Sequence, residues 1–343
     1  MMPKKTSTKP IRRVILFGGA PLLVATSKWL RKNGYELHVY TSPRHAAEPV
    51  EADGSTLAQA LARLGIKFVS TEDINAEASL LPLIDHTTLG IGMGEAWSFN
   101  RDLIDRFGGR LLDFMGIPHP RYRGGAHYTW MILRGDKEGG CNLQIINADM
   151  VQGVFDSGEI VASRKYRFPS GARIPQDYFD AAVKQEVRFI ETFLGELKRG
   201  KRFVPKKPDE SRSLHLPRLH TLHNGWIDWS WDGAAIERFI CAFDAPYKGA
   251  STFVDGRRVH LKSARLVRGE RPFHPFQSGL ITRIWAGKLS VATASGHLEV
   301  ERVAGEDGSD LLPSLKIGMR FMTPHLQLEQ AMAYSPDYGA VKK

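Results

Sequence analysis

The sequence is poor in cysteine and has no long apolar run, and each absence argues against a class of protein. Its 343 residues include two cysteines, Cys141 and Cys241, which lie far apart and form no C-x-x-C pair. A disulfide framework or a cysteine-based metal site is therefore not expected, and a reducing, cytoplasmic compartment fits. No apolar run reaches the roughly 20 residues that a helix needs to cross a bilayer, so no membrane partner is expected.

The sequence has an excess of positive charge, with a formal net charge of +10. The basic start, residues 1–12, is not followed by the apolar core of a signal peptide, and we predict a disordered leader there. A positive excess favours anionic partners such as RNA, nucleotide-sugars or folate. It equally suits a basic protein that its charge keeps soluble, so the charge leaves the partner open.

The first two hundred residues alternate between strand-like and helix-like segments. A strand at Val14–Phe17, a Gly18-Gly19 turn, helical spacing over 21–34 and a second strand over 35–42 form a β-α-β opening. Similar patterns predict further helices over 101–107, 127–136 and 178–198, and further strands over 89–92, 110–115, 140–147 and 159–168. This order predicts an α/β fold with a mainly parallel, Rossmann-like sheet over residues 13–203.

A change of composition marks the end of that region. The Pro- and Lys-rich residues 204–213 are predicted to be a linker. Residues 214–305 then contain a helix and several short strands with Gly turns, and residues 306–343 are assigned to a tail. We therefore expect a second, smaller domain rich in β-structure.

Two short motifs lie about thirty residues apart, PRYRG at 120–124 and FDSGEI at 155–160. They resemble the P-[RK]-Y-R-G and L-D-T-G-D-I motifs of the folate-dependent formyltransferases. The resemblance implies transfer of a formyl group from 10-formyltetrahydrofolate to an amine, without a metal. It makes Asp156 the third catalytic residue, and it assigns to a substrate loop Arg121, Tyr122, Arg123 and Gly124.

Three more motifs extend the resemblance to the rest of the chain. IDW at 227–229, PYKGA at 246–250 and GR at 256–257 follow one another as in the methionyl-tRNA and sugar N-formyltransferases. In those two-domain proteins the carboxy-terminal module is a small, OB-like β-barrel. The resemblance covers roughly residues 13 to 305 and implies such a barrel here.

The resemblance fails at two catalytic positions. The family's Asn-x-His motif falls on Asp113 and Met115 when positions are counted back from Pro120. An ionised Asp113 repels the oxyanion that forms during acyl transfer, and it donates a hydrogen bond only if burial keeps it protonated. Met115 takes part in no proton transfer. We therefore expect slow or lost formyl transfer with ordinary amines, with Asp156 as the retained group.

Two histidines near the motif are candidates for the missing base, His119 and His127, and each is also a plausible structural residue. The folate loops implied by the resemblance are 92–99 and 147–155. Backbone groups and aromatic rings there are the candidates for folate binding, and the second loop is longer than is usual in the family. The candidate folate residues are Gly94, Trp97, Phe99, Asn147 and Phe155.

Weaker patterns were weighed against simpler explanations. Gly18-Gly19 lacks the G-x-G-x-x-G spacing of a nicotinamide site. The histidines at 215, 220 and 223 lack supporting carboxylates for a metal. The tryptophans at 226, 229 and 231 could stack on nucleic-acid bases, and they also suit the core of a domain, which we favour.

Three kinds of function remain open. The first is formylation of a small-molecule amine, such as an amino sugar on a nucleotide. The second is a methionyl-tRNA formyltransferase, which is less favoured because residues 42–55, where such enzymes carry a basic insertion, are mildly acidic and contain no Lys. The third is a catalytically inactive binding or regulatory protein, and a variant of the first changes the donor or the one-carbon group.

Overall fold

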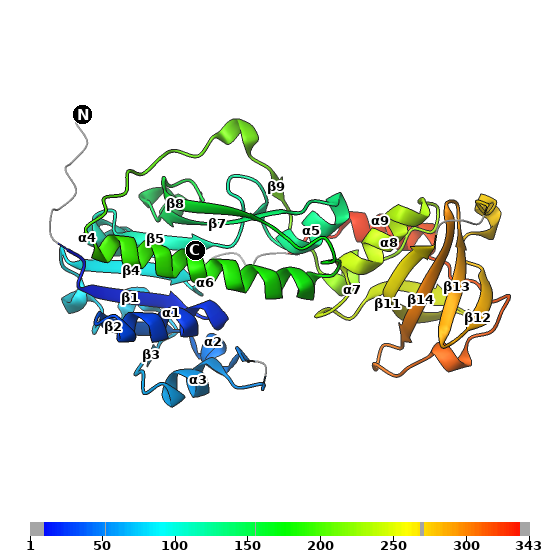
Figure 1. Ribbon diagram of the computed structural model, residues 1–343, viewed down its shortest axis with the longest axis horizontal. Helices are drawn as coiled ribbons and strands as arrows, with labels where there is room; N and C mark the ends of the chain where they lie inside the picture. Colours follow the sequence, from blue (N-terminus) through cyan, green and yellow to red (C-terminus); the bar gives the residue numbers. More distant parts are fainter. Residues whose placement is uncertain (1–9, 52, 155, 268–270, 337–343) are drawn as a thin grey trace. The chain divides into compact units, whose positions relative to one another are not determined.

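The computed structural model describes residues 10–51, 53–154, 156–267 and 271–336 (Figure 1). The chain divides into two compact units, each made of several stretches of sequence. The first comprises Met1–Arg123, Glu138–Tyr166 and Ala182–Leu214, and the second comprises Gly124–Lys137, Arg167–Ala181 and His215–Lys343. The expected linker, 204–213, therefore belongs to the first unit, and two segments from before residue 203 belong to the second.

The first unit is built on a seven-stranded sheet with the order β3-β2-β1-β4-β5-β7-β8. The first five of these strands are parallel, and β7 runs antiparallel to β5. The mostly parallel α/β sheet predicted from the sequence is confirmed. The strands are β1 (Arg13–Gly18), β2 (Glu36–Thr41), β3 (Val69–Ser70), β4 (Thr88–Met93), β5 (Leu111–Met115), β7 (Glu138–Ile145) and β8 (Ile160–Arg167).

Helices cover both faces of this sheet because its buried strands are apolar on both sides. On β1, Val14 and Leu16 join one apolar cluster, and Ile15 and Phe17 join the other. Figure 1 shows α1 and α6 on the same side of the sheet, and their side chains belong to the first cluster. The helices are α1 (Ala20–Lys32), α2 (Pro43–Ala47), α3 (Leu57–Arg63), α4 (Arg101–Phe107), on the second cluster, and α6 (Pro175–Lys198).

The second unit contains a five-stranded antiparallel sheet with the order β10-β11-β14-β13-β12. A short pair, β6 (Arg123–Gly124) and β9 (His215–Leu216), lies where the chain passes from one unit to the other. The other elements are α5 (His127–Arg134), α7 (Thr221–Asn224), α8 (Gly233–Ala242), β10 (Ala250–Val254), β11 (Arg257–Val267), β12 (Ile281–Trp285), β13 (Lys288–Thr293), β14 (Gly296–Ala304) and α9 (His325–Ala333).

Residues 318–322 connect the two edges of this sheet. Met322 and Phe253 of β10 exchange both backbone hydrogen bonds, and the Gly318 N–H donates to the Ile281 carbonyl of β12. The sequence assigned these residues to a tail, whereas they complete the barrel-like sheet. The tail was misassigned because residues 318–322 pair with strands that lie far away in the sequence.

Of the three tryptophans at 226, 229 and 231, the first two are core residues, as favoured from the sequence, and Trp231 is partly buried. Trp226 stacks on Phe253 with ring centroids 5.0 Å apart, and Trp229 stacks on Phe321 at 5.7 Å. Among the described residues no group of three His, Cys, Asp or Glu side chains is arranged to hold a metal. None of the helices in the described part of the chain is long and apolar enough to cross a membrane.

Candidate active site

A row of polar positions crosses the first sheet near the carboxyl ends of its parallel strands. Gly92 of β4, Asp113 of β5 and Gln144 of β7 are register partners. Partner residues on neighbouring strands direct their side chains to the same face. One layer below them, Leu111 and Ile146 belong to the apolar cluster of that face. The polar row therefore lies at the end of the sheet where open α/β folds bind ligands.

Glu95 adds a second carboxyl to this row. A Cβ placed on Gly92 would lie 2.5 and 2.7 Å from the two Glu95 carboxyl oxygens. The Glu95 carboxyl therefore occupies the space that a side chain at position 92 would fill, directly beside Asp113. Gly94, with a φ of +69°, lets the chain turn back between them.

Burial and mutual repulsion change the ionisation of these carboxyls. The pKa of Asp113 is raised well above its ordinary value, first by burial and then by the charges of Glu95 and Asp156. Burial also raises the pKa of Glu95 to about 7. The backbone N–H of Glu95 opposes this shift, and the charge of Asp156 adds to it. Burial and the neighbouring carboxyls therefore favour the protonated form of Asp113, which is the form able to donate an O–H, as a buried carboxylic acid does in other enzymes.

Asp156 lies in a turn that β7 holds in place. Its φ of +58° is left-handed, and its carbonyl accepts hydrogen bonds from Gln144 Nε2 at 2.9 Å and Arg123 Nη2 at 2.8 Å. Gln144 Nε2 also donates to the Gly158 carbonyl at 2.6 Å. A side chain at Gly158 would overlap the Ile145 carbonyl, so the Asp-Ser-Gly sequence suits this turn. The turn brings Asp156 within electrostatic reach of Asp113 and Glu95.

Arg123 connects the PRYRG loop to that turn and to residues 210–213. Its guanidinium donates to both carboxyl oxygens of Glu210, at 2.5 and 2.9 Å, and to Ser213 Oγ at 2.9 Å. Its Nε donates to His119 Nε2 at 3.1 Å. The side chain is only 12% exposed. Its contacts make Arg123 an organising residue of the site.

The two histidines proposed as replacement bases differ in position. Burial, followed by the charge of Arg123, lowers the pKa of His119 to about 4, while the Asp156 carbonyl and Glu210 oppose the shift. With Nε2 already accepting from Arg123, His119 supports the loop. His127 begins α5 in the second unit, where burial lowers its pKa to about 4 and its ring meets the edge of Tyr128.

The remaining residues of the PRYRG loop shape its backbone. Tyr122 is buried and has a φ of +63°, and Arg121 lies over its ring at 5.9 Å. Gly124 has a φ of +96°, and any side chain there would overlap the Leu216 carbonyl. The local backbone therefore requires glycine at position 124, whereas Tyr122 holds a left-handed conformation that side-chain-bearing residues seldom adopt.

Met115 lies on the same face as Asp113, one layer nearer the strand end. Its partner on β7 is Asn142, which is 1% exposed. Asn142 Nδ2 donates to the Ile117 carbonyl at 3.2 Å, whereas its Oδ1 has no hydrogen-bond partner among the described residues. The layer above the carboxyls thus offers an unsatisfied buried acceptor and an apolar thioether, and no group that transfers protons.

The first predicted folate loop contains one open position and two packed rings. Gly94 is exposed, with open space around a Cβ placed on it. Phe99 is 1% exposed and meets Phe17 edge-on at 5.2 Å, so its ring packs in the apolar core and leaves little surface for a folate to stack on. Trp97 donates from Nε1 to the Glu72 carbonyl at 3.0 Å and packs on the same cluster.

The second predicted folate loop contains a short 3-10 helix, η3 (Ala148–Gln152). Asn147 Oδ1 accepts from the Asp149 N–H at 3.2 Å and from Ser157 Oγ at 3.1 Å, so it holds the loop together. Val151 and Val154 are 53% and 51% exposed. Phe155 lies outside the described residues. The two valines therefore leave apolar surface exposed on this loop.

Sequence reasoning missed Glu95, Gln144 and Glu210. Asn142 and Gln144 alternate with apolar residues in a buried strand, and that pattern could have placed them on one polar face. Glu95 was a charged residue in a Gly-rich turn after a buried strand. No pattern in the sequence indicated Glu210, because its partner Arg123 lies 87 positions away.

Comparisons with known proteins agree with this architecture. Residues 221–313 match the family described as "Formyl transferase, C-terminal domain". The chain is 28% identical over 269 residues to a methionyl-tRNA formyltransferase of Roseiflexus sp. (strain RS-1), covering 75% of this chain and 78% of the relative.

Solved structures share the fold at lower sequence identity. An N-formyltransferase from Helicobacter canadensis, in complex with folinic acid and dTDP-3-aminofucose, has a TM-score of 0.63 and 13% identity, covering 84% of this chain and 98% of that chain. HypX from Aquifex aeolicus, in complex with tetrahydrofolic acid, has a TM-score of 0.54 and 17% identity, covering 87% and 45%. The domain match and the sequence relative support a formyltransferase family, and the solved structures agree with it in fold.

Proposed function

We propose that this protein of the formyltransferase family transfers a formyl group from 10-formyltetrahydrofolate to a small-molecule amine, through an altered active site. The observation that carries the proposal is the convergence of Asp113 and Asp156, which are far apart in the sequence and electrostatically coupled in the fold. Both lie beside two loops that border one apolar cluster, through Trp97 and Met150. Structural neighbours with tetrahydrofolic acid and folinic acid support a folate donor.

In this proposal, the residues of the chain perform two tasks. Protonated Asp113 donates its O–H to the formyl oxygen, in the place where the family has an Asn, and so stabilises the charge that develops there. Asp156, fixed by Gln144 and Arg123, orients the attacking group. Neither task requires a metal, in keeping with the family resemblance.

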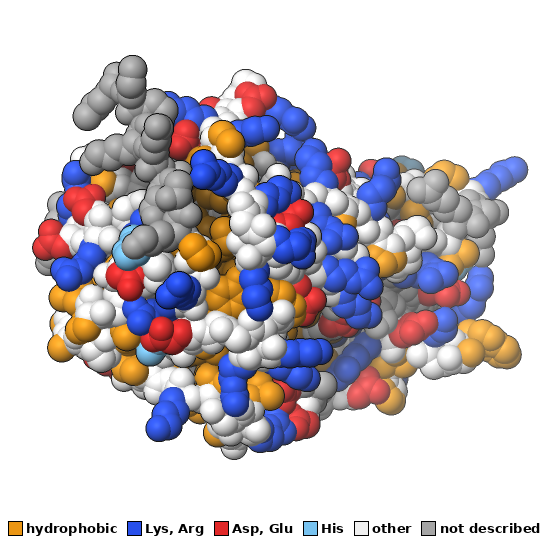
Figure 2. All heavy atoms as spheres, turned by 60° about the vertical axis from the view of Figure 1, so that its left-hand side comes forward, with side chains coloured by type: hydrophobic (Ala, Val, Ile, Leu, Met, Phe, Trp, Pro, Cys, Tyr) orange, Lys and Arg blue, Asp and Glu red, His pale blue; other side chains and the backbone are white. Residues whose placement is uncertain are grey.

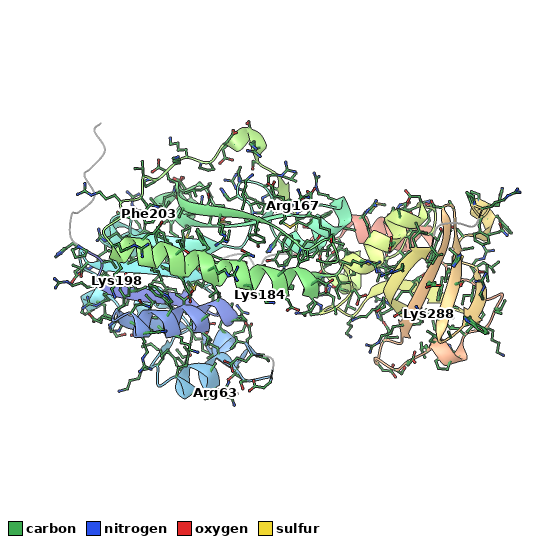
Figure 3. All side chains as sticks on the ribbon, viewed as in Figure 1. Arg63, Arg167, Lys184, Lys198, Phe203 and Lys288 are labelled. Atoms are coloured by element: carbon green, nitrogen blue, oxygen red, sulfur yellow. The ribbon has the colours of Figure 1, made fainter. Side chains whose placement is uncertain are left out.

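A methionyl-tRNA acceptor is the second candidate, because the sequence relatives bear that name. Residues 42–55, where such enzymes carry a basic insertion, argue against a tRNA acceptor. Arg44 there pairs with Glu48, and Arg63, labelled in Figure 3, pairs with Glu51 and Asp53. Figure 2 likewise shows Lys and Arg interspersed with Asp and Glu over the face it draws. Paired cations contribute little to phosphate binding.

The test is formylation of an acceptor panel by the full chain with 10-formyltetrahydrofolate, read by mass spectrometry of the products. The panel contains nucleotide-linked amino sugars, other small amines and methionyl-tRNA. We expect a formylated small amine, and we expect Asp156→Asn to lower the rate by about 10²–10⁴. Asp105→Asn, which removes an exposed carboxylate of α4 that pairs with Arg101, is the matched control.

Two results would contradict the proposal in different ways. If methionyl-tRNA is the one acceptor in the panel that is formylated, the proposed acceptor class, a small-molecule amine, is wrong. Failure of the protein to bind a folate analogue such as 5-formyltetrahydrofolate, measured by calorimetry, would remove the folate donor and with it the proposed reaction.

A further inference from the structure

We propose that Glu95 is the proton-transfer residue of this site and replaces the histidine that is missing at Met115. The inference rests on the proposed function. Formyl transfer requires a group that removes a proton from the attacking amine, and Met115 cannot do so. Among the described residues of the site, Glu95 carries an ionisable side chain in the polar row, beside Asp113.

The position of Glu95 is built into the fold. Its carboxyl lies over Gly92, whose lack of a side chain leaves the space that both carboxyl oxygens occupy. Gly92 is the register partner of Asp113, so the Glu95 carboxyl, which lies over β4, and the Asp113 carboxyl on β5 are on one face of the sheet. The residue as a whole keeps partial exposure, which access to a bound amine requires.

An independent observation indicates that a molecule binds at this end of the sheet. Asn142 is buried, lies opposite Met115 on the same face, and has an Oδ1 without a partner among the described residues. Buried acceptors in proteins are normally satisfied, because an acceptor that loses its water without gaining a hydrogen-bond partner destabilises the folded state. A hydrogen-bond donor from a bound molecule would satisfy it, directly above the carboxyl row.

The charges around Glu95 are well suited to proton transfer. Asp113 and Asp156 face it with carboxyls, and the nearby cation, Arg123, is occupied by Glu210, His119 and the Asp156 carbonyl. Burial and the Asp156 charge raise the pKa of Glu95 to about 7. A base with such a pKa is half ionised near neutral pH, where general bases are most effective.

The step balances in atoms and charge. The amine nitrogen forms a bond to the formyl carbon while the formyl oxygen gains negative charge, which the O–H of Asp113 stabilises. Glu95 accepts the proton that the amine nitrogen loses. The bond between the formyl carbon and the donor nitrogen then breaks, and Glu95 returns its proton to that nitrogen. Glu95 and Asp113 end in their starting states.

The first part of the test measures the protonation of Glu95 and Asp113 in the absence of turnover. Infrared difference spectra of the full chain, with ¹³C-labelled carboxyl groups, are recorded between pH 5 and 9. We expect a protonated carboxyl band that disappears near pH 7 and is absent from Glu95→Gln, and a second band that persists above pH 7 and is absent from Asp113→Asn. A wild-type protein in which both carboxyls are already ionised at pH 6 overturns the inference.

The second arm reads the reaction. In single-turnover formyl transfer, Glu95→Gln should lower the rate by about 10²–10⁴ and abolish the rise with pH near 7, with unchanged binding of 5-formyltetrahydrofolate. Glu186→Gln is the control, because burial also raises the pKa of Glu186 to about 7 but no carboxyl of the site acts on it. An unchanged rate and pH profile in Glu95→Gln overturns the base role.

Failure of the inference and failure of the proposed function give different results. A wild-type protein that binds the folate analogue and formylates its acceptor independently of Glu95 refutes the inference alone. A protein that binds no folate analogue refutes the proposed function, while the infrared titration still decides whether Asp113 and Glu95 hold protons as stated.

Discussion

Each face of the first sheet carries a glutamate whose pKa is raised to about 7, and the two residues differ in their surroundings. Burial alone raises the pKa of Glu186 of α6. The charge of Glu186 in turn adds to the effect of burial in raising the pKa of the Cys141 thiol. Glu95 lies at the strand ends beside two further carboxyls, and the same face of the sheet carries the unsatisfied Asn142 oxygen. The comparison teaches that a raised pKa marks burial, whereas neighbouring groups and position mark a site.

Replacement of Asp113 should have the largest effect on the Glu95 face. Asp113→Ala removes the donor to the formyl oxygen and should lower formyl transfer by about 10²–10³. Asp113→Asn keeps a donor of the same size and should retain most of the rate. The comparison of the two variants in single-turnover assays decides the role. Equal losses would show that the carboxyl itself, and not its hydrogen, is required.

Replacement of Glu186 should affect stability and leave transfer unchanged. Its folded-state pKa of about 7 lies above the ordinary 4.5, so the folded protein binds the extra proton between these values. Stability is then fully present below pH 4.5 and is lost as the pH rises through 7. Glu186→Gln removes this loss and should stabilise the first unit by about 3 kcal/mol at pH 8, at about 1.4 kcal/mol per pKa unit.

Urea unfolding of the full chain at pH 4.5 and pH 8 measures this effect. The variant should match the wild type at the lower pH, because both side chains are then neutral. Glu191→Gln, on the same helix, serves as the control. A stabilisation that does not change with pH would mean that Glu186 is not neutral in the folded protein.

Replacement of Gly92 should disturb the Glu95 carboxyl through crowding. Gly92→Ala places a methyl group on both carboxyl oxygens and should destabilise the protein by about 1–3 kcal/mol. It should also push the carboxyl outward and lower the pH at which the Glu95 infrared band disappears. Gly90→Ala crowds Leu111 and Phe107 one layer below and should destabilise without that shift. If the Glu95 band disappears at the same pH in both variants, the space over Gly92 does not determine the pKa of Glu95.

Introduction of a histidine at Met115 should give the smallest effect. In the Glu95→Gln background, Met115→His returns a base to the position where the family has one, and we expect a rate gain of about tenfold, below the 10²–10⁴ of an optimally placed histidine. Met115→Leu in the same background should give none. Rescue by both variants would point to packing as the cause of the gain.

The sequence by itself determined the elements whose signals are local. The Gly18-Gly19 turn, α4 over Arg101–Phe107 and the strand ending at Met115 followed from periodicity and turn residues. The two motifs identified Asp156 and the PRYRG loop, and counting from Pro120 placed Asp113 and Met115 at a strand end. The same count predicts that the family's Asn-x-His positions fall on Asp113 and Met115 here.

Only the tertiary structure decided what those changes mean. Whether Asp113 is ionised depends on burial and on Glu95 and Asp156, which approach it from another strand and from a distant turn. The joining of residues 318–322 to both β10 and β12 likewise depends on backbone partners far away in the sequence. Periodicity in the sequence indicates which side of a helix or strand is buried. The pKa of a buried carboxyl and the pairing of a closing segment depend instead on residues that are distant in the sequence and become neighbours only in the folded chain.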